Sequence, residues 1–300
     1  MLRESSNHIA NPQHRFIPKH SFGIIARSTL VAHQAQTLER RATSEPPRIP
    51  FIMVAMTSIA KTNTPLKAIL VIPAYNEEDC IVDVAKMIES AGYDYVIVND
   101  GSIDSTLEKC KENNLNVLDL PRNLGIGGAV QAGHKYALRN GYDVDIQVDG
   151  DGQHDISYIP KLLEKIENGA DLVIGSRFLQ KTEGFQSTFM RRVGIKWLSG
   201  LLSKLYKVKV TDPTSGFRAS GKRALELFSY TYPIDYPEPE SIADALNHKL
   251  LVKEVSVEMK ERAGGESSIK ALSGAYYMIK VSLAILICKL ENTSLRKKVN

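Results

Sequence analysis

The sequence has little cysteine. Cys80, Cys110 and Cys288 are the three thiols of a 300-residue chain, and they lie far apart. Their spacing matches no cysteine-based metal site, and such sparse use is typical of a reduced compartment. The N-terminus also lacks a signal peptide of normal form. We therefore expect a cytoplasmic protein.

Beyond residue 56 the chain has no excess of either charge. Seven of its 38 Lys and Arg and three of its 34 Asp and Glu lie in residues 1–56, so the rest carries 31 of each. A domain that binds nucleic acid usually has a basic surface. We therefore expect no nucleic-acid partner.

No apolar run is long enough to cross a bilayer. The most apolar stretch, residues 281–288, has eight residues between Lys280 and Lys289, whereas a span needs about 20. It belongs to a long helical pattern at 268–290 that is too apolar for a solvated helix. We expect this segment either to pack in the core or against a partner, or to lie in the membrane interface. The basic residues at 296–298 favour the interface, because they attract anionic lipid.

Residues 1–56 differ from the rest of the chain. They hold four of the seven histidines, few periodic apolar positions and a Pro-rich break at 45–50. We expect a disordered or dispensable leader. An Arg-rich, acid-poor leader also suits a transit peptide. The interpretation that we favour is that the natural start is Met56 and that residues 57–300 form one domain.

From Lys67 onward, apolar strands alternate with helical patterns. We expect strands at 68–72, 95–98, 116–120, 144–148 and 171–174, and helices at 78–91, from Asp104, and at 127–140 and 157–167. This alternation predicts an α/β fold with a mostly parallel sheet and helices on both faces. The second half is less regular, with a helix expected at 189–206 and a strand at 253–259.

Polar clusters follow the expected strands at 73–78, 99–104, 149–155 and 175–177. In open α/β sheets ligands bind beyond the carboxyl ends of the strands, so we expect a single site there. Asp149 and Asp151 point to the same side if the backbone stays extended. Two such carboxylates with Gln153 suit Mg²⁺ or Mn²⁺ shared with phosphate oxygens. A polar turn after a strand is the alternative interpretation.

Two further segments carry carboxylates. In residues 236–240 two prolines would stiffen a loop before a helix, although Pro239 and Glu240 also suit an ordinary helix start, and we expect Glu238 rather than Glu240 to face an acceptor. Asp212 competes with it, although its neighbours could form a structural turn. The glycines at 125–128 do not fit a dinucleotide fingerprint, and we expect them to allow close approach of a loop and a ligand. His154 could touch phosphate, but a structural hydrogen bond is the more common role.

Seven motifs in order give the chain a family resemblance. They are Ile72–Glu78, Val98–Ser102 with Asp104 and Thr106, Asn123–Gly125, Asp149–Gln153, Gly175–Arg177, Asp212–Arg218 and Arg262–Ser268. From about Leu66 to Ala275 the chain resembles glycosyltransferase family 2, near the dolichyl-phosphate mannose synthase and polyprenyl-phosphate glycosyltransferase group. The resemblance implies an inverting, metal-dependent enzyme with a GT-A-like, Rossmann-type fold that uses a nucleotide-diphosphate sugar.

The resemblance also implies roles for individual residues. It places Pro73, Ala74, Tyr75 and Glu77 around the nucleotide base and ribose, and Asp100 at the base. Asp149, Asp151 and Gln153 match the family's metal site, with Asp151 also counted as catalytic. Arg177, Arg262 and either Arg191 or Arg192 are candidates for phosphate contacts. Asp104 is expected to cap a helix.

We therefore predict transfer of a sugar to a polyprenyl-phosphate or another lipid-linked or glycan acceptor, as in cell-wall or polysaccharide biosynthesis. The enzyme would be peripheral on the inner face of the cell membrane, and a separate membrane protein is one further partner to consider. Two alternatives remain open, a sugar-1-phosphate nucleotidylyltransferase and a non-catalytic nucleotide-sugar binding subunit. The intact carboxylates argue against the second alternative.

Overall fold

The computed structural model describes residues 65–180, 189–259 and 271–299. The predictions about residues 1–56 and about Arg262 lie outside these ranges. The described chain belongs to one compact unit, residues 63–300. Within the described part, no helix has the length and hydropathy needed to cross a membrane.

The first half of this unit alternates strands and helices as predicted. The elements are β1 (Ala68–Ala74), α2 (Ile81–Ser90), β2 (Asp94–Asn99), α3 (Thr106–Glu112), β3 (Val117–Asp119), α4 (Gly125–Arg139) and β4 (Val144–Gln147). Apolar β-branched runs form the strands, and their side chains are almost entirely buried. Helix α2 buries Ile81, Val84, Ala85 and Ile88, which share one helical face.

The second half contains elements that the sequence pattern did not predict. It runs through η1 (Ile156–Tyr158), α5 (Ile159–Glu167), β5 (Leu172–Ser176), α6 (Phe189–Tyr206), β6 (Arg218–Gly221), α7 (Lys222–Tyr230), α8 (Pro237–Asn247), β7 (Val252–Ser256) and α9 (Ala271–Val299). Strand β6 and helix α7 were missed. Of the two interpretations of residues 236–240, the helix start is the one observed, beginning two residues before Pro239: α8 starts at Pro237, and Glu238 lies in its first turn.

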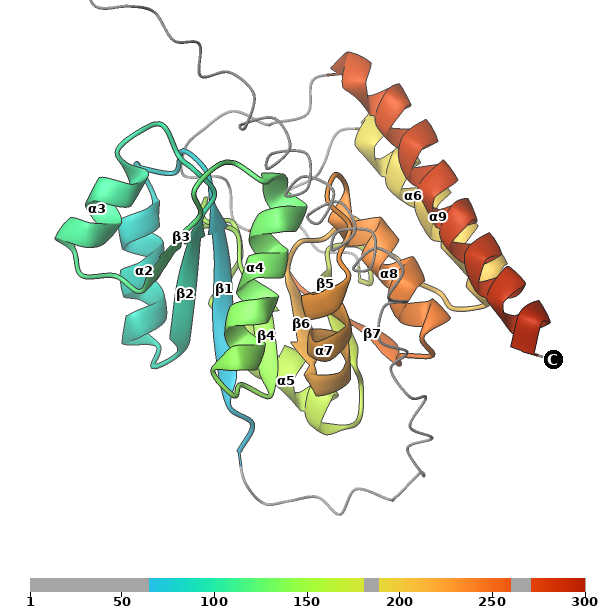
Figure 1. The fold of residues 1–300 in the computed structure, drawn as a ribbon, viewed down its shortest axis with the longest axis horizontal. Coiled ribbons are helices and arrows are strands. Elements are labelled where there is room, and N and C mark those ends of the chain that lie inside the picture. The colour runs from blue at the N-terminus through green and yellow to red at the C-terminus, as the bar shows by residue number, and fades with distance from the viewer. Residues whose placement is uncertain (1–64, 181–188, 260–270, 300) are drawn as a thin grey trace, which may run out of the picture. The chain divides into compact units, whose positions relative to one another are not determined.

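The seven strands form one sheet in the order β3-β2-β1-β4-β6-β5-β7 (Figure 1). All neighbouring pairs are parallel except those of β6, which runs antiparallel to both β4 and β5. The prediction of a mostly parallel sheet is therefore confirmed. Because β6 is reversed, its first residue, Arg218, lies beside Gln147 at the carboxyl end of β4.

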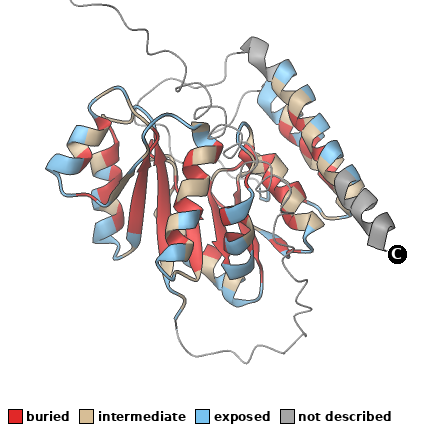
Figure 2. Ribbon diagram, in the orientation of Figure 1, coloured by how far each residue is buried: buried red, intermediate tan, exposed pale blue. Residues whose placement is uncertain are grey.

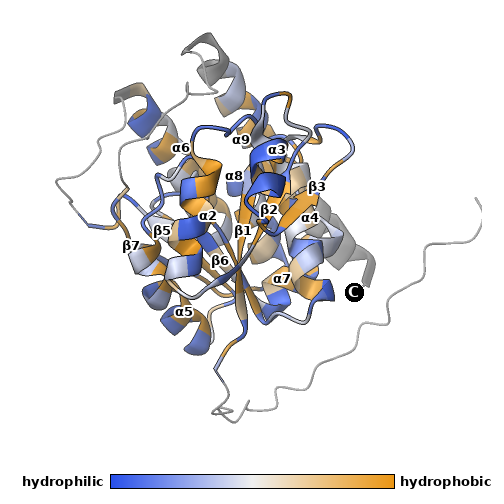
Figure 3. Ribbon diagram, turned by 90° about the vertical axis from the view of Figure 1, so that its left-hand side faces the viewer, coloured by the Kyte–Doolittle hydropathy of each residue, from blue (hydrophilic) through white to orange (hydrophobic). Residues whose placement is uncertain are grey.

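Helices cover both faces of the sheet, which is buried between them (Figure 2). Alternate residues of β1 serve the two faces: Leu70 and Ile72 pack in one core with α2 and α5, and Ile69 and Val71 pack in another with α4. Figure 3 shows the strands, β1 among them, as strongly apolar segments of the ribbon. A third core lies under α6, α7, α8 and α9.

Helix α9 lies along α6, and the two run in the same direction. Met278 packs against Gly194, and the Trp197 indole N–H donates to Ser282 at 3.0 Å. One side of α9 is buried, with Val281 and Ile285 in the third core. The other side exposes apolar residues: Tyr276, Ile279, Leu283, Leu286, Ile287 and Leu290. Core packing and an exposed apolar face therefore coexist in one helix.

Candidate functional site

The loops after β1 and β2 are bound to each other at the carboxyl edge of the sheet. The Asn76 amide donates to the Ser102 hydroxyl at 3.0 Å, and the Ile103 amide donates to the Asn76 side chain at 2.9 Å. Asn76 adopts a left-handed conformation with φ 57°, which asparagine tolerates well. Next to it, Tyr75 is 44% exposed. The predicted base-stacking residue thus stands on a braced loop, open to solvent.

Two aspartates in the loop after β2, Asp104 and Asp100, accept hydrogen bonds from backbone amides near helix starts. The first of them is Asp104. The Asp104 carboxylate accepts hydrogen bonds from the amides of Thr106 and Glu78, at 3.0 and 3.2 Å. Burial acts to raise the pKa of Asp104, but these hydrogen bonds outweigh it and leave the pKa below its ordinary value. The N-cap of α3 itself is Ser105, one residue later than expected, although Asp104 provides the capping carboxylate.

Asp100 is buried and faces the start of α4. Its carboxylate accepts from the Leu124 amide at 2.7 Å, and its own amide donates to the Ala74 carbonyl at 2.9 Å. Burial raises the pKa of Asp100, and the amides of Leu124 and Gly125 partly oppose this. Asp100 therefore joins β1 to α4, in addition to the base-reading role expected from the resemblance.

The acidic segment after β4 does not stay extended. The chain turns at residues 150–152, where Gly152 has φ +74°. Strand alternation therefore does not set the orientation of Asp149 and Asp151, contrary to our expectation. Asp151 is buried and accepts from the Gln153 amide at 3.0 Å, whereas the Asp149 side chain is 37% exposed.

His154 holds Asp149 in place. Its Nδ1 accepts from the Asp149 amide at 3.0 Å, and its Nε2 lies 3.4 Å from the Asp149 carboxylate. The buried ring stacks on Phe217, with ring centroids 4.9 Å apart. Of the two roles considered for His154, the structure shows the structural hydrogen bond.

The donor set fits a divalent cation that keeps ligands for a substrate. Asp149, Asp151 and Gln153 offer hard oxygens, and the Asp149 carboxylate is partly open to solvent. Among the described residues, no three His, Cys, Asp or Glu side chains are grouped to hold a metal. The fit to a divalent cation therefore rests on the oxygen chemistry of these three side chains.

Arg177 and Asp212 form a buried ion pair. The Arg177 guanidinium donates to both Asp212 oxygens, at 2.7 and 2.9 Å, and to the Thr214 hydroxyl at 3.0 Å. The Asp212 side chain is fully buried, and the Glu254 carboxylate accepts from the Thr211 and Asp212 amides. The candidate base Asp212 and the candidate phosphate contact Arg177 therefore bind each other.

Glu238 faces this same edge from the first turn of α8. Burial raises the pKa of Glu238, the positive charge of Arg218 opposes this, and the carboxylate of Asp149 adds to it. The positive charge of Arg177 also lowers the pKa of Glu238. Glu238 thus lies within electrostatic reach of both Asp149 and Arg177, which come from other parts of the sheet edge.

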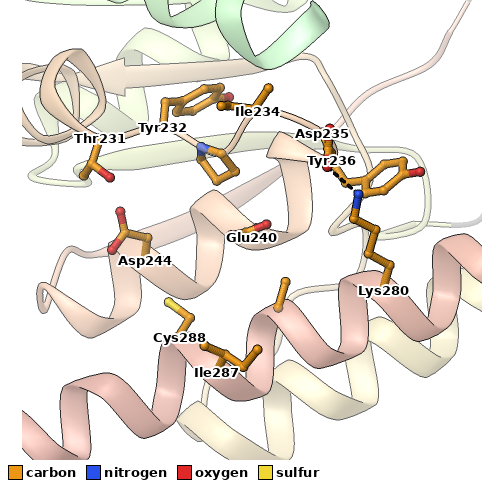
Figure 4. A pocket seen from close by; sticks show the side chains of 12 residues that line it. Thr231, Tyr232, Ile234, Asp235, Tyr236, Glu240, Asp244, Lys280, Ile287 and Cys288 are labelled. Atoms are coloured by element: carbon orange, nitrogen blue, oxygen red, sulfur yellow. Dashed lines mark hydrogen bonds and ion pairs between the residues drawn. The ribbon is translucent and has the colours of Figure 1, made fainter.

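Glu240 faces the other way. It lines a cavity of about 550 Å³ between the segment 231–236, α8 and α9 (Figure 4). Burial and the nearby Asp244 and Asp235 raise the pKa of Glu240. Lys280 reaches from α9 to Asp235 across the same cavity. Asp149 and Asp151 do not line it, so this cavity is separate from the sheet-edge site.

Two glycines permit close packing around the site. A Cβ on Gly127 would lie 2.0 Å from the Pro233 carbonyl oxygen, and the Gly127 amide donates to the Ile234 carbonyl. The glycines at 125–128 were expected to allow close approach of a ligand, whereas at Gly127 the space is filled by the protein's own backbone at residues 233–234. A Cβ on Gly216 would lie 3.2 Å from an Asp149 carboxylate oxygen. Gly216 therefore lets the loop before β6 contact Asp149.

Arg218 was not singled out from the sequence, yet it is fully buried at this edge. Its guanidinium donates to the carbonyls of Ser215 and Glu238 and to the Ser241 hydroxyl. The only available signal was its position at the end of the 212–218 motif. A single arginine is more often exposed than buried, so its buried position becomes evident only when its tertiary partners are known.

Comparison with known proteins agrees with this geometry. The family model "Glycosyl transferase family 2" matches residues 69–228. The UDP-N-acetylglucosamine–dolichyl-phosphate N-acetylglucosaminyltransferase of Methanococcus voltae is 34% identical over 63% of this chain and 83% of its own length. The polyprenol monophosphomannose synthase of Mycolicibacterium smegmatis is 28% identical over 72% and 86%.

The chain also shares its fold with solved structures of low sequence identity. Glucosyl-3-phosphoglycerate synthase from Mycobacterium tuberculosis superposes with a TM-score of 0.57 at 18% identity, covering 75% of this chain and 78% of that one. Its crystals contained Mn²⁺, UDP and phosphoglyceric acid. With the family model matching more than half of the chain, this protein is a member of glycosyl transferase family 2.

Proposed function

We propose that this glycosyltransferase moves a sugar, with inversion, from a nucleotide-diphosphate sugar to a polyprenyl phosphate. The observation that carries the proposal is that the loop beside Asp149 is joined through Arg218 to the first turn of α8, which carries Glu238. Relatives whose names specify dolichyl-phosphate or polyprenol acceptors support the choice of acceptor.

The donor nucleotide would bind over the β1 and β2 loops. Tyr75 is exposed and suited to stacking on the base, while Glu77 can accept ribose hydroxyls. Pro73 and Ala74 end β1 and would form the floor of this subsite together with Asp100. The hydrogen bonds between backbone amides and side chains of the two loops hold this surface before the ligand arrives, which reduces the ordering cost of binding.

Mg²⁺ or Mn²⁺ would be held by Asp149, Asp151 and Gln153. When bound, the cation would neutralise the charge that develops on the leaving diphosphate. The protein's own part is to fix Asp149, which it does with His154 and the close-packed Gly216 loop. The Mn²⁺ and UDP in the crystals of the structural neighbour support a divalent ion of this kind.

In the transfer step an acceptor oxygen attacks the anomeric carbon from the side opposite the diphosphate. The new C–O bond forms, the bond to the diphosphate breaks, and the nucleotide diphosphate leaves. A phosphate acceptor is already ionised, whereas a hydroxyl acceptor would pass its proton to Glu238. We propose that Asp212 is a positioning residue and not the catalytic base. It orients Arg177, whose Nε and Nη2 it engages, so that Nη1 can meet phosphate.

The exposed faces of α6 and α9 would lie against the membrane that holds the lipid acceptor. Trp197 on α6 is 62% exposed, and Met190 and Val193 continue its apolar face beside that of α9. Aromatic and aliphatic side chains of this kind suit the headgroup boundary. Lys280 would not reach the headgroups, because it binds Asp235. We place this surface on the inner face of the cell membrane.

The proposal is tested by incubating the protein with UDP-, GDP- and dTDP-sugars and polyprenyl phosphate in micelles. We expect lipid-linked sugar from one donor, loss of activity with EDTA, and recovery on adding Mn²⁺ or Mg²⁺. Formation of nucleotide sugar from a sugar 1-phosphate would instead show a nucleotidylyltransferase. Saturable donor binding without turnover on any acceptor would show a binding subunit.

A further inference from the structure

A stripe of buried polar residues crosses the centre of the sheet. Asp145 and Gln147 on β4 pair with Ser220 and Arg218 on β6, and all four are buried. Val144 and Ile146 of β4 face the opposite, apolar core. An apolar residue would be the ordinary choice at each position of this stripe, since it lies between the sheet and a layer of helices.

Arg218 is the charged member of the stripe, and its contacts join two parts of the site. Nε and Nη2 donate to the Ser215 carbonyl at 3.1 and 2.6 Å. Nη1 donates to the Glu238 carbonyl at 3.2 Å and to the Ser241 hydroxyl at 2.9 Å. We call Arg218 with these three partners the Arg218 clamp. It fastens the loop that contacts Asp149 to the first turn of the helix that carries Glu238.

The location of this cation is costly for the fold. A helix N-terminus carries partial positive charge, so a buried cation beneath the first turn of α8 is disfavoured. Among the described residues, none of the hydrogen bonds of Arg218 goes to a carboxylate; its acceptors are neutral oxygens. A buried charge without a directly bonded counter-ion is rare, because desolvation opposes it. Maximum stability therefore does not explain the residue.

The surroundings of the clamp carry further polar groups without full hydrogen bonding. His134 and Asp145 pair through one atom each, and their other side-chain polar atoms have no hydrogen bond within the described chain. The Tyr232 ring packs edge-on against His134, with ring centroids 4.9 Å apart. Arg218 therefore stands in a polar layer that the fold maintains at the expense of apolar packing.

We infer that Arg218 is a positioning residue for the transfer reaction, holding Glu238 at a fixed distance from the Asp149 edge through the clamp. This inference rests on the proposed function. Ser215 precedes Gly216, whose backbone touches the Asp149 carboxylate, and Glu238 supplies its own carbonyl to the clamp. The guanidinium is thus a rigid spacer between the donor side and the acceptor side, a task for which a planar fork is better suited than an ammonium group.

Ser241→Ala is the most selective test, and the chain offers a matched control. Ser241 and Ser229 are both buried, and each donates its hydroxyl to the carbonyl three residues earlier, Glu238 and Glu226 respectively. Ser241 additionally accepts from Arg218. Comparing Ser241→Ala with Ser229→Ala therefore separates the contacts that Ser241 makes beyond its own helix, with Arg218 and with Tyr232, from the loss of a helical serine.

We expect Ser241→Ala to lower kcat by about tenfold with little change in donor KM, since small misplacements of reacting groups are costly. Ser229→Ala should leave both within about twofold, and both variants should melt at similar temperatures. Arg218→Lys, which keeps the charge but loses the fork, should lower kcat further. Full turnover in Ser241→Ala or in Arg218→Lys would overturn the inference, as would equal losses in the two serine variants.

Hydrogen exchange provides a readout that does not depend on turnover. Peptides covering the first turn of α8 should exchange faster in Ser241→Ala and Arg218→Lys than in the wild type, and not in Ser229→Ala. If the wild type transfers no sugar, the proposed function fails, while this exchange pattern still decides whether Arg218 fixes the helix. Unchanged exchange in both clamp variants would refute the positioning role.

Discussion

Replacing Asp212 by Asn tests whether this residue is a base or the anchor of Arg177. The change is nearly isosteric, so it removes charge without opening a cavity. Arg177 has a side chain only 9% exposed, and Asp212 is fully buried. The variant therefore leaves a guanidinium without its counter-ion in a place that water does not reach, which is far more costly than breaking a surface pair.

The magnitude follows from the burial of the pair. Removing one partner of a buried ion pair costs about 3–5 kcal/mol. For a domain of 150–250 residues each kcal/mol lowers the melting temperature by roughly 2–4 °C. We therefore expect Asp212→Asn to melt about 6–20 °C lower. The double variant Arg177→Met with Asp212→Asn should recover much of this loss, because no uncompensated charge remains.

The assay is a double-mutant cycle by urea unfolding of the wild type, both single variants and the double variant. We expect a coupling energy of about 2–3 kcal/mol between the two sites. The double variant should regain stability without regaining turnover, because Arg177 is then absent. Two results would refute this reasoning: additive losses, or an Asp212→Asn protein that is fully stable yet inactive. The second result would make Asp212 the base.

Three further predictions follow from the site and its surroundings. Asp151→Asn should abolish most transfer and metal-dependent nucleotide binding while the circular dichroism spectrum stays native; undiminished turnover would contradict the metal assignment. Glu238→Gln should lower kcat more than donor affinity when a hydroxyl acceptor is used, and a change confined to donor KM would make Glu238 a binding residue. Gly127→Ala should destabilise by about 2–4 kcal/mol, because the new methyl group displaces the 233–234 backbone. Gly200→Ala, in open space on α6, should be neutral or stabilising by up to about 1 kcal/mol; equal losses in the two glycine variants would refute the packing argument.

The strands and helices that form early in the chain could be predicted because local pattern and tertiary role agree there. The apolar runs of β1 and β2 are buried on both faces, as parallel strands require. The bounds expected for α6, 189–206, are those observed. In these segments no distant contact is needed to choose between helix and strand.

Strand β6 and the start of α8 could not be read in the same way. The four residues of β6, Arg218–Gly221, contain no apolar run, and the strand exists because β4 and β5 hold it on both sides. In α8, Pro237 and Pro239 suggested a loop, although proline fits the first turn of a helix because it has no amide to satisfy.

The residues of the candidate site also divide into those that the local sequence could identify and those that it could not. The acidic motif after β4 could be recognised from neighbouring residues alone. The Arg177–Asp212 pair joins residues 35 apart in the chain, and the Arg218–Ser241 contact spans 23. Nothing in the local sequence shows that Arg177 is already bound by a carboxylate. Such pairings depend on how the sheet brings β5, β6 and α8 together, which spacing does not reveal.

Because β6 is reversed, the segments of the proposed donor subsite and those of the proposed acceptor subsite can change independently in evolution. The donor subsite is built on the ends of the parallel strands β1, β2 and β4, whereas β6 reaches the same edge with its beginning. The loop at 212–217 therefore enters from a different chain direction, and α8 follows after α7. Insertions or substitutions in these later segments can reshape the acceptor side while the strands beneath the nucleotide keep their register. In the function that we propose, the reversed strand would thus separate the segments that bind the donor from those that meet the acceptor.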